Sequence, residues 1–292
     1  MATHFRKSPY LFITHAYNSF LKCCALNTKN SIPTFIISLP KDAHRREQLG
    51  KQLQDLAMPF SVIQAVHGKS LSSEELAASY DRDKAIALFN RELSKGEIGC
   101  ALSHLSIYRK MVEEDIPYAL ILEDDARILD EDLPATLSKL AQCHAAQAPV
   151  AVLLNHVMRY DGSTKIQLDD NRCLYEAYRG VNAHAYFITK AAAEILVRNL
   201  YPVYVVADKW EYFQEQYFPV KAMVPYPIGL APVCLSSSID AMGKRVKKIG
   251  NGRNYKYYLR KYLNQLKFLI MSRPFIRLEH QRVHELDSQP FQ

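Results

Sequence analysis

An apolar run at residues 118–122 ends in three adjacent carboxylates, Glu123, Asp124 and Asp125, and few folds accommodate that arrangement. A run that is apolar without alternation predicts a strand buried on both faces, as in a parallel sheet. Ligands of open α/β sheets bind at the carboxyl ends of such strands. Carboxylates gathered there repel one another, and a hard divalent cation with a bound diphosphate would stabilise them. The alternative is that Asp124 or Asp125 caps a turn while the other carboxylates face water.

Segments typical of strands and helices alternate along the chain from residue 34 onward. Strands are expected at residues 34–39, 60–66, 118–122, 150–154, 173–178 and 185–188. Helices are expected after Asp42, after the capping box of Ser72 and Glu75, from residue 98, around 133–140, at 190–200 and at 209–217. This alternation predicts an α/β fold with a mainly parallel sheet and helices on both faces. The polar stretch 160–171, with Asp-Gly-Ser turn chemistry, is expected to be a surface loop or a flap.

The positive charge of the chain is concentrated near its C-terminus. Eleven Lys or Arg residues and no acid lie between Asp240 and Glu279, which leaves 26 basic and 30 acidic residues elsewhere. Residues 9–26 lack a signal-peptide cleavage site, so a poorly ordered or peripheral extension is expected before the folded part. We therefore expect an N-terminal extension at residues 1–30, a catalytic domain at 31–240 and a basic C-terminal segment at 241–292.

The basic segment contains one amphipathic stretch. Between residues 255 and 272, Leu259, Leu263, Leu266 and Ile270 fall on one helical stripe among basic residues. This pattern predicts either a helix lying on an anionic membrane surface or a helix packed on the core with a solvated basic face. Tyrosines interleaved with the basic residues also suit a nucleic-acid-binding protein. Because the rest of the chain is mildly acidic, no nucleic-acid partner is expected.

The six cysteines show neither a Cys-x-x-Cys pair nor the spacing of a metal finger. We expect them to be reduced thiols of a cytoplasmic protein, with Cys100 as a small buried residue of its helix. No stretch approaches the roughly 20 apolar residues that a membrane-spanning helix needs.

Residues 95–104, Lys-Gly-Glu-Ile-Gly-Cys-Ala-Leu-Ser-His, precede the acidic triplet by one helix. This combination resembles glycosyltransferase family 25, which includes bacterial lipooligosaccharide galactosyltransferases. The resemblance also covers residues 34–39, Arg45 and Arg46, the Ala-Val-His-Gly stretch at 65–68, residues 185–189 and Asp208. Two positions depart from the family pattern, since Ser38 replaces an Asn and His67 replaces an Asp. Ser38 can still donate and accept a hydrogen bond, whereas no charge-based role carries over to His67.

The resemblance implies a GT-A fold, in which a Rossmann-like nucleotide-binding half merges with an acceptor half. It implies an inverting, metal-dependent transfer of a hexose, most simply galactose from UDP-galactose, to a lipooligosaccharide acceptor. UDP-glucose and UDP-N-acetylglucosamine are alternative donors. The enzyme would then act as a peripheral protein at the cytoplasmic face of the bacterial inner membrane.

The acidic triplet takes the place of the Asp-x-Asp motif of GT-A enzymes. The resemblance implies that Asp125 binds Mn²⁺ or Mg²⁺, that Asp124 supplies a second contact and that Glu123 meets the ribose of the donor. Such a cation is commonly held by one or two carboxylates together with the diphosphate oxygens. Ser38, at the end of the first strand, is expected to contact the donor as well.

Other candidate residues each have a second interpretation. Arg45 and Arg46 can bind phosphate or form a solvated helix face. Gly68 is expected to form a tight turn beside the nucleotide. His104 can order the acidic strand end, contact the donor or be structural. Ser103 cannot be its dyad partner, because adjacent helical residues point about 100° apart.

The resemblance and the need for a base make Asp208 the candidate that deprotonates the acceptor hydroxyl. Asp208 follows an apolar run, and its alternative role is the N-cap of the helix at residues 209–217. Trp210 and Tyr212 can stack on an acceptor sugar or belong to the core.

Overall fold

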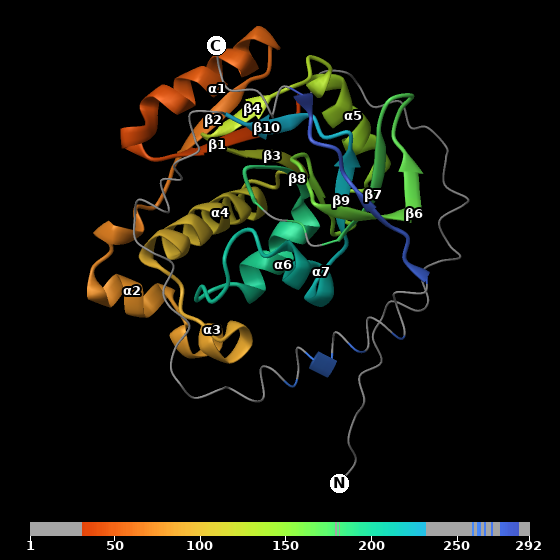
Figure 1. Ribbon diagram of the computed structural model, residues 1–292. Helices are drawn as coiled ribbons and strands as arrows, with labels where there is room; N and C mark the ends of the chain where they lie inside the picture. Colours follow the sequence, from red (N-terminus) through yellow and green to blue (C-terminus); the bar gives the residue numbers. More distant parts are fainter. Residues whose placement is uncertain are drawn as a thin grey trace. The chain divides into compact units, whose positions relative to one another are not determined.

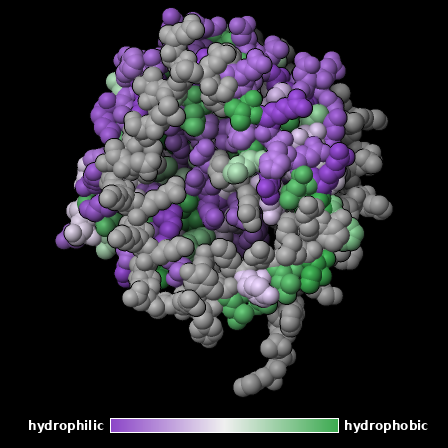
Figure 2. All heavy atoms as spheres, in the orientation of Figure 1, coloured by the Kyte–Doolittle hydropathy of each residue, from purple (hydrophilic) through white to green (hydrophobic). Residues whose placement is uncertain are grey.

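The computed structural model describes residues 31–178, 180, 182–231, 259, 262, 263, 266, 270 and 275–285, all within the unit Ser31–Gln292 (Figure 1). The expected N-terminal extension lies outside these residues, and the domain boundaries stay predictions. None of the helices formed by the described residues is long and apolar enough to cross a bilayer. Figure 2 shows a face that is largely hydrophilic, with hydrophobic residues in small separate groups.

Nine of the described strands form one sheet in the order β11-β6-β7-β9-β5-β8-β3-β1-β2, and β10 pairs with β4. The strands are β1 Thr34–Ser38, β2 Phe60–Gln64, β3 Tyr118–Glu123, β4 Ala126–Ile128, β5 Ala151–Leu153, β6 Arg159–Gln167, β7 Cys173–Tyr178, β8 Ala185–Thr189, β9 Val220–Val224, β10 Ile228–Leu230 and β11 Leu278–His280. In the large sheet, β8, β7 and β11 run opposite to the other strands. The sheet is therefore mixed, with a parallel group β2-β1-β3 at one edge.

Helices cover both faces of this sheet (Figure 1). They are α1 Ala43–Asp55, α2 Ser73–Ser79, α3 Arg82–Phe89, α4 Lys95–Glu113, α5 Leu133–Cys143, α6 Lys190–Asn199 and α7 Trp210–Gln216, with the short 3-10 helices η2 Pro40–Asp42 and η3 Gly68–Ser70. Successive strand residues point to opposite faces. Ile36 and Leu120 pack with α1 and α5, whereas Phe35 and Ile121 pack with α4 and α6.

The predicted α/β fold with helices on both faces of a central sheet is confirmed. The parallel strands β2, β1 and β3, with α1 and α4 on the connections between them, form the Rossmann-like part. The sheet is less parallel than predicted, because antiparallel β8 lies between β3 and β5 and because β6 and β7 form a hairpin. The basic C-terminal helix lies mostly outside the described residues, although Leu259, Tyr262, Leu263 and Leu266 are helical.

The prediction of a loop or flap at residues 160–171 is wrong. Most of that stretch belongs to β6, which pairs with β7 and, around Asp161, with β11. The turn chemistry is accommodated inside the strand, where Asp161 Oδ1 accepts hydrogen bonds from the amide (3.0 Å) and hydroxyl (2.7 Å) of Ser163. The pairing with β7 shifts register between Asp161 and Ile166. A polar bulge in a strand therefore has the same local sequence as a turn.

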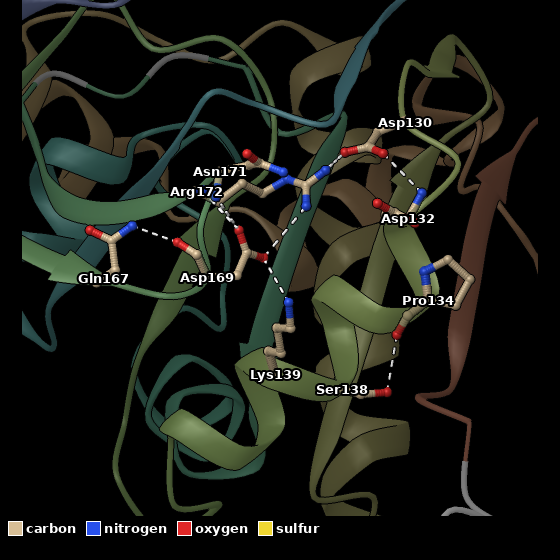
Figure 3. Close-up of polar contacts among 9 residues, drawn as sticks. All are labelled: Asp130, Asp132, Pro134, Ser138, Lys139, Gln167, Asp169, Asn171 and Arg172. Carbon is tan, nitrogen blue, oxygen red and sulfur yellow. Dashed lines mark hydrogen bonds and ion pairs between the residues drawn. The ribbon is translucent and has the colours of Figure 1, made fainter.

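The tip of the β6–β7 hairpin is tied to α5 and to the segment before it (Figure 3). The guanidinium of Arg172, a buried residue, pairs with Asp130 and lies 3.6 Å from Asp169 Oδ2. Lys139 Nζ on α5 lies 3.1 Å from the same oxygen. These ion pairs hold the tip in place, which argues against a flap.

Helix α4 meets the end of β2 at a contact that requires glycine. A Cβ on Gly99 would overlap the Val66 carbonyl and lie 2.7 Å from the Gly68 amide nitrogen, and a Cβ on Gly68 would overlap the Lys95 carbonyl. Ser103 joins the same elements, since its hydroxyl accepts from Val66 N (2.8 Å) and donates to Gly99 O (2.7 Å). Gly68 therefore allows close backbone approach within the tight turn that the sequence predicts, since residues 68–70 form η3 and Ser70 N donates to His67 O at 2.8 Å.

Because Gly99 lies so close to the backbone of residues 66–68, adding one methyl group at this position should destabilise the fold. Gly99→Ala should lower the free energy of unfolding by about 1–3 kcal/mol, because two backbone segments must separate. Gly50→Ala is the matched control, since its Cβ would meet only the ring tip of Phe60, at 3.0 Å, and alanine is the better helix former. Urea unfolding of both variants measures the difference. Equal destabilisation, or none in Gly99→Ala, would contradict the account.

Candidate active site

The acidic triplet occupies the end of β3 and the turn that leads to β4. Asp124 N donates to Ile37 O on β1 (3.1 Å), and Asp125 O accepts from Ala231 N (2.8 Å) after β10. The side chains of Glu123 and Asp124 are only 25% and 12% exposed. Asp124 and Asp125 do form a turn, as the alternative has it, but the carboxylates of the triplet do not face water.

Glu123 ends a buried chain of hydrogen-bonded side chains. Its Oε1 lies 3.2 Å from Nε2 of His104, a residue of α4 that is 1% exposed. His104 Nδ1 lies 2.7 Å from the Tyr186 hydroxyl on β8, and that hydroxyl lies 2.7 Å from the Tyr108 hydroxyl on α4. A neutral His104 satisfies every group when Nε2–H donates to Glu123 and Nδ1 accepts from Tyr186, which accepts from Tyr108. The chain thus fixes one oxygen of Glu123.

Glu123 remains ionised in spite of its burial. Burial alone would raise its pKa, but the hydrogen bond that His104 donates lowers the pKa below its ordinary value. The backbone adds a further link, because Glu123 N donates to His184 O at 2.9 Å. The triplet therefore contains one carboxylate that the protein itself stabilises.

The other two carboxylates are stabilised less well. Burial raises the pKa of Asp124 to about 6, against the hydrogen bond from Ser38 and the charge of Arg45. Burial raises the pKa of Asp125 to about 8, with the negative charges of Glu123 and Asp124 as the next causes. Positive charge at this place would therefore favour the ionised form of both.

Arg45 and Arg46, in the first turn of α1, lie against the strand ends. Arg46 Nη1 donates to Ser38 Oγ at the end of β1 (3.2 Å), and Arg45 Nη1 lies 4.0 Å from Asp124 Oδ1. Both arginines are partly buried, so the alternative of a solvated helix face does not describe them. They bring guanidinium groups to the carboxyl ends of β1 and β3, where a phosphate would be bound.

Asp208 lies close enough to the acidic strand end for the charge of Glu123 to act on it. It accepts a backbone hydrogen bond from Asn182, and burial followed by the charge of Glu123 raises its pKa. Helix α7 begins at Trp210 with Lys209 as its N-cap and no side-chain cap hydrogen bond. The alternative role of Asp208 as that cap is therefore wrong.

The residues present fit a hard divalent cation. Asp125 Oδ1 is buried and has no hydrogen-bond partner among the residues that the structure describes. A buried carboxylate oxygen without a partner carries a desolvation cost, which a bound cation would offset. Asp124 and Asp125 offer only oxygen atoms, the ligands that Mg²⁺ and Mn²⁺ prefer.

Several residues of this region escape the sequence analysis. Tyr108 and Tyr186 complete the chain that holds His104, and Cys100 lies close to both His104 and Glu123. The spacing of Cys100 and His104, four residues apart on one helix, could have indicated a shared face. Trp210 is fully buried against Tyr186, so of its two expected roles the core is observed. Tyr212 likewise packs against other aromatic rings.

The sequence model of glycosyltransferase family 25, described as an LPS biosynthesis protein family, matches residues 31–210. The chain belongs to glycosyltransferase family 25. The matched range contains every candidate site residue, from Ser38 to Asp208.

Among curated members of family 25, procollagen galactosyltransferase 1-A of Xenopus laevis is 32% identical over 96 residues, which are 32% of this chain and 16% of the relative. A Bos taurus protein named "probable inactive glycosyltransferase 25 family member 3" is 33% identical over 100 residues, which are 32% of this chain and 16% of that protein. The chain thus matches only about a sixth of the length of these relatives. A crystal structure of the galactosyltransferase LgtC with donor and acceptor sugar analogues is 11% identical, covers 82% of this chain and 97% of that one, and gives a TM-score of 0.35. A score this low transfers no residue roles.

The structure brings most of the predicted site residues of this family 25 protein together. Ser38, Arg45 and Arg46 meet Asp124 at the ends of β1 and β3, and His104 holds Glu123. Gly68 differs, because it packs on the first turn of α4. The functional roles of these residues stay predictions.

Proposed function

We propose that this family 25 protein is an inverting, metal-dependent glycosyltransferase that transfers a hexose from a UDP-sugar to a lipooligosaccharide acceptor. The observation that carries the proposal is the meeting of two arginines with three carboxylates at the carboxyl ends of β1 and β3. The family description and relatives named galactosyltransferases support lipooligosaccharide as the acceptor and galactose as the donor sugar. UDP-glucose and UDP-N-acetylglucosamine are the alternative donors. Since some relatives are named inactive, activity itself belongs to the proposal.

The donor would bind along the strand ends. Arg45 and Arg46 would contact the diphosphate, Ser38 would donate a hydrogen bond, and Glu123 would accept one from the ribose. Asp125 and Asp124 would hold Mn²⁺ or Mg²⁺, which when bound supplies positive charge opposite the diphosphate leaving group. The His104 chain keeps Glu123 in one orientation, so that the donor meets a prearranged acceptor of hydrogen bonds.

Asp208 is assigned to the proton transfer. As the acceptor hydroxyl oxygen attacks the anomeric carbon, the bond to UDP breaks and UDP leaves with the electron pair. Asp208 takes the proton of the hydroxyl. Its raised pKa makes it a stronger base than an ordinary aspartate, and burial beside Glu123 is the cause.

The assignment of Asp208 predicts a specific kinetic change. Asp208→Asn should lower kcat for transfer from UDP-galactose by about 10²- to 10⁴-fold, the usual contribution of a general base, while donor affinity stays the same. Turnover assays give kcat, and calorimetry gives the donor Kd. Glu211→Gln is the matched control, because Glu211 lies three residues away on α7 and pairs with Lys209 at 3.6 Å.

Two outcomes would contradict this part of the proposal. Parallel loss of donor affinity in Asp208→Asn would make the residue a donor or metal ligand. Absence of UDP release by the unmodified protein from any UDP-hexose would reject the glycosyltransferase activity. Salt-dependent retention on DNA would then favour the rival nucleic-acid-binding function.

A location at the cytoplasmic face of the inner membrane also belongs to the proposal, because a lipid-linked acceptor resides at a membrane. Leu259, Leu263, Leu266 and Ile270 of the expected apolar stripe are 51%, 51%, 39% and 65% exposed. An exposed apolar stripe is what a helix lying on a membrane surface would present to the lipid.

Sedimentation with lipid vesicles tests this location. We expect binding to anionic vesicles that falls with salt, since each basic residue near such a surface contributes about 1 kcal/mol. Leu263→Gln combined with Leu266→Gln should weaken the binding, whereas Met158→Gln, which alters an apolar side chain that is 56% exposed and outside this stripe, should not. Equal recovery in the supernatant with anionic and neutral vesicles would reject the membrane role.

A further inference from the structure

Three side chains of different chemistry converge beside the acidic triplet. Cys100 and His104 lie one helical turn apart on α4, and Glu123 faces them from the end of β3. The thiol sulfur, a ring nitrogen and a carboxylate oxygen of these residues all lie within 4.8 Å of one another. The proposed transfer reaction uses Glu123 but leaves Cys100 without a role.

The spacing of these atoms suits a tetrahedral cation. Ligand bonds of about 2.0 Å for nitrogen and oxygen place two such ligands roughly 3.3 Å apart in a tetrahedron. His104 Nε2 and Glu123 Oε1 are already 3.2 Å apart. Metal-binding histidines usually have their second nitrogen held by another polar group. Here the Tyr186 hydroxyl lies 2.7 Å from His104 Nδ1.

We propose that Cys100, His104 and Glu123 form a second cation site, for a borderline-soft divalent ion of the Zn²⁺ class, with water as the fourth ligand. Its thiolate and imidazole ligands distinguish it from the oxygen-only pair Asp124 and Asp125, which suits Mg²⁺ or Mn²⁺. The negative surroundings favour a cation at this place. The negative charges of Glu123, Asp208 and Asp125 all act on the Cys100 thiol.

Binding of the ion requires the loss of one proton and the movement of others along the His104 chain. Binding of the ion releases the Cys100 proton to solvent, because the thiolate is the ligand. The His104 proton moves from Nε2 to Nδ1, which then donates to the Tyr186 hydroxyl, and that hydroxyl donates to Tyr108. The Tyr108 hydroxyl, which then accepts from Tyr186, turns its own proton away from Tyr186, while the heavy-atom positions of the chain stay the same.

Occupation of this site would have a consequence for catalysis. A cation on Glu123 would withdraw that carboxylate from the donor ribose, so Zn²⁺ should compete with the UDP-sugar. This consequence rests on the proposed function, whereas the site itself does not.

Cobalt titration of the full chain tests the site without turnover. Co²⁺ added to chelator-treated protein should give a thiolate-to-cobalt charge-transfer absorption that saturates at one equivalent and disappears on addition of Zn²⁺ but not of Mg²⁺. Cys100→Ser and Cys100→Ala should lose the absorption. Cys143→Ser and Cys173→Ser, at two other free cysteines of the described residues, should keep it. Asp125→Asn should also keep it, which separates this site from the hard-cation site.

Each other outcome overturns the proposal. These outcomes are no absorption in the unmodified protein, an absorption that persists in both Cys100 variants, or one that is lost in a control cysteine variant. Thermal unfolding gives an independent readout that does not depend on absorption. Zn²⁺ should raise the Tm of the unmodified protein and leave that of Cys100→Ala unchanged, and an equal increase in both would place the ion elsewhere. Failure of UDP-sugar transfer would leave these results unaffected.

Discussion

The hydrogen bond between His104 and Glu123 joins helix α4 to the acidic end of β3, and the arrangement of the candidate active site depends on it. A buried carboxylate is costly unless it is paired and hydrogen-bonded. His104 supplies that pairing and keeps the pKa of Glu123 low. Tyr186 and Tyr108 fix the imidazole in turn. Glu123 is thus ionised without a bound cation, and its charge adds to burial in raising the pKa of Asp125 and Asp208.

The position of His104 depends on features far from it in the sequence. Helix α4 can approach β2 because Gly99 and Gly68 have no Cβ, and Ser103 secures the contact with two hydrogen bonds. The following residue, His104, then points to the strand end. The main role of residues 96–104, from Gly96 to His104, is therefore to let helix α4 pack closely against the end of β2. Their chemical contribution is the pair of side chains that face Glu123, His104 and Cys100.

Local sequence patterns predict those helices and strands that contain a recognisable cap or a regular apolar spacing. The capping box of Ser72 and Glu75 and the buried leucines of α5 are where the sequence places them. Asp42 does precede α1 but makes no side-chain cap hydrogen bond. The sequence does not predict strand β6, because the bulge at Asp161 resembles a turn and only the pairing with β7 and β11 identifies the strand. Trp210 could not be assigned to core or ligand, because that depends on what packs around it.

The acidic end of β3 can be predicted from the sequence as a candidate site, whereas the side-chain hydrogen bonds around it cannot. An apolar run followed by three carboxylates can be recognised in the amino-acid sequence. Tyr186 lies 82 residues from His104, and no local pattern indicates that their side chains meet. Cys100 looked like a core residue for the same reason, since the carboxylates beside it come from another element.

The central claim is that Asp125 and its neighbours hold a cation and the diphosphate of the donor. Anomalous diffraction from crystals soaked with Mn²⁺ and UDP tests it most directly. The account predicts a manganese peak beside the Asp125 carboxylate, with UDP phosphates next to Arg45 and Arg46, and no such peak in Asp125→Asn. UDP bound with its phosphates away from the ends of β1 and β3, or a manganese peak unchanged in Asp125→Asn, would contradict it.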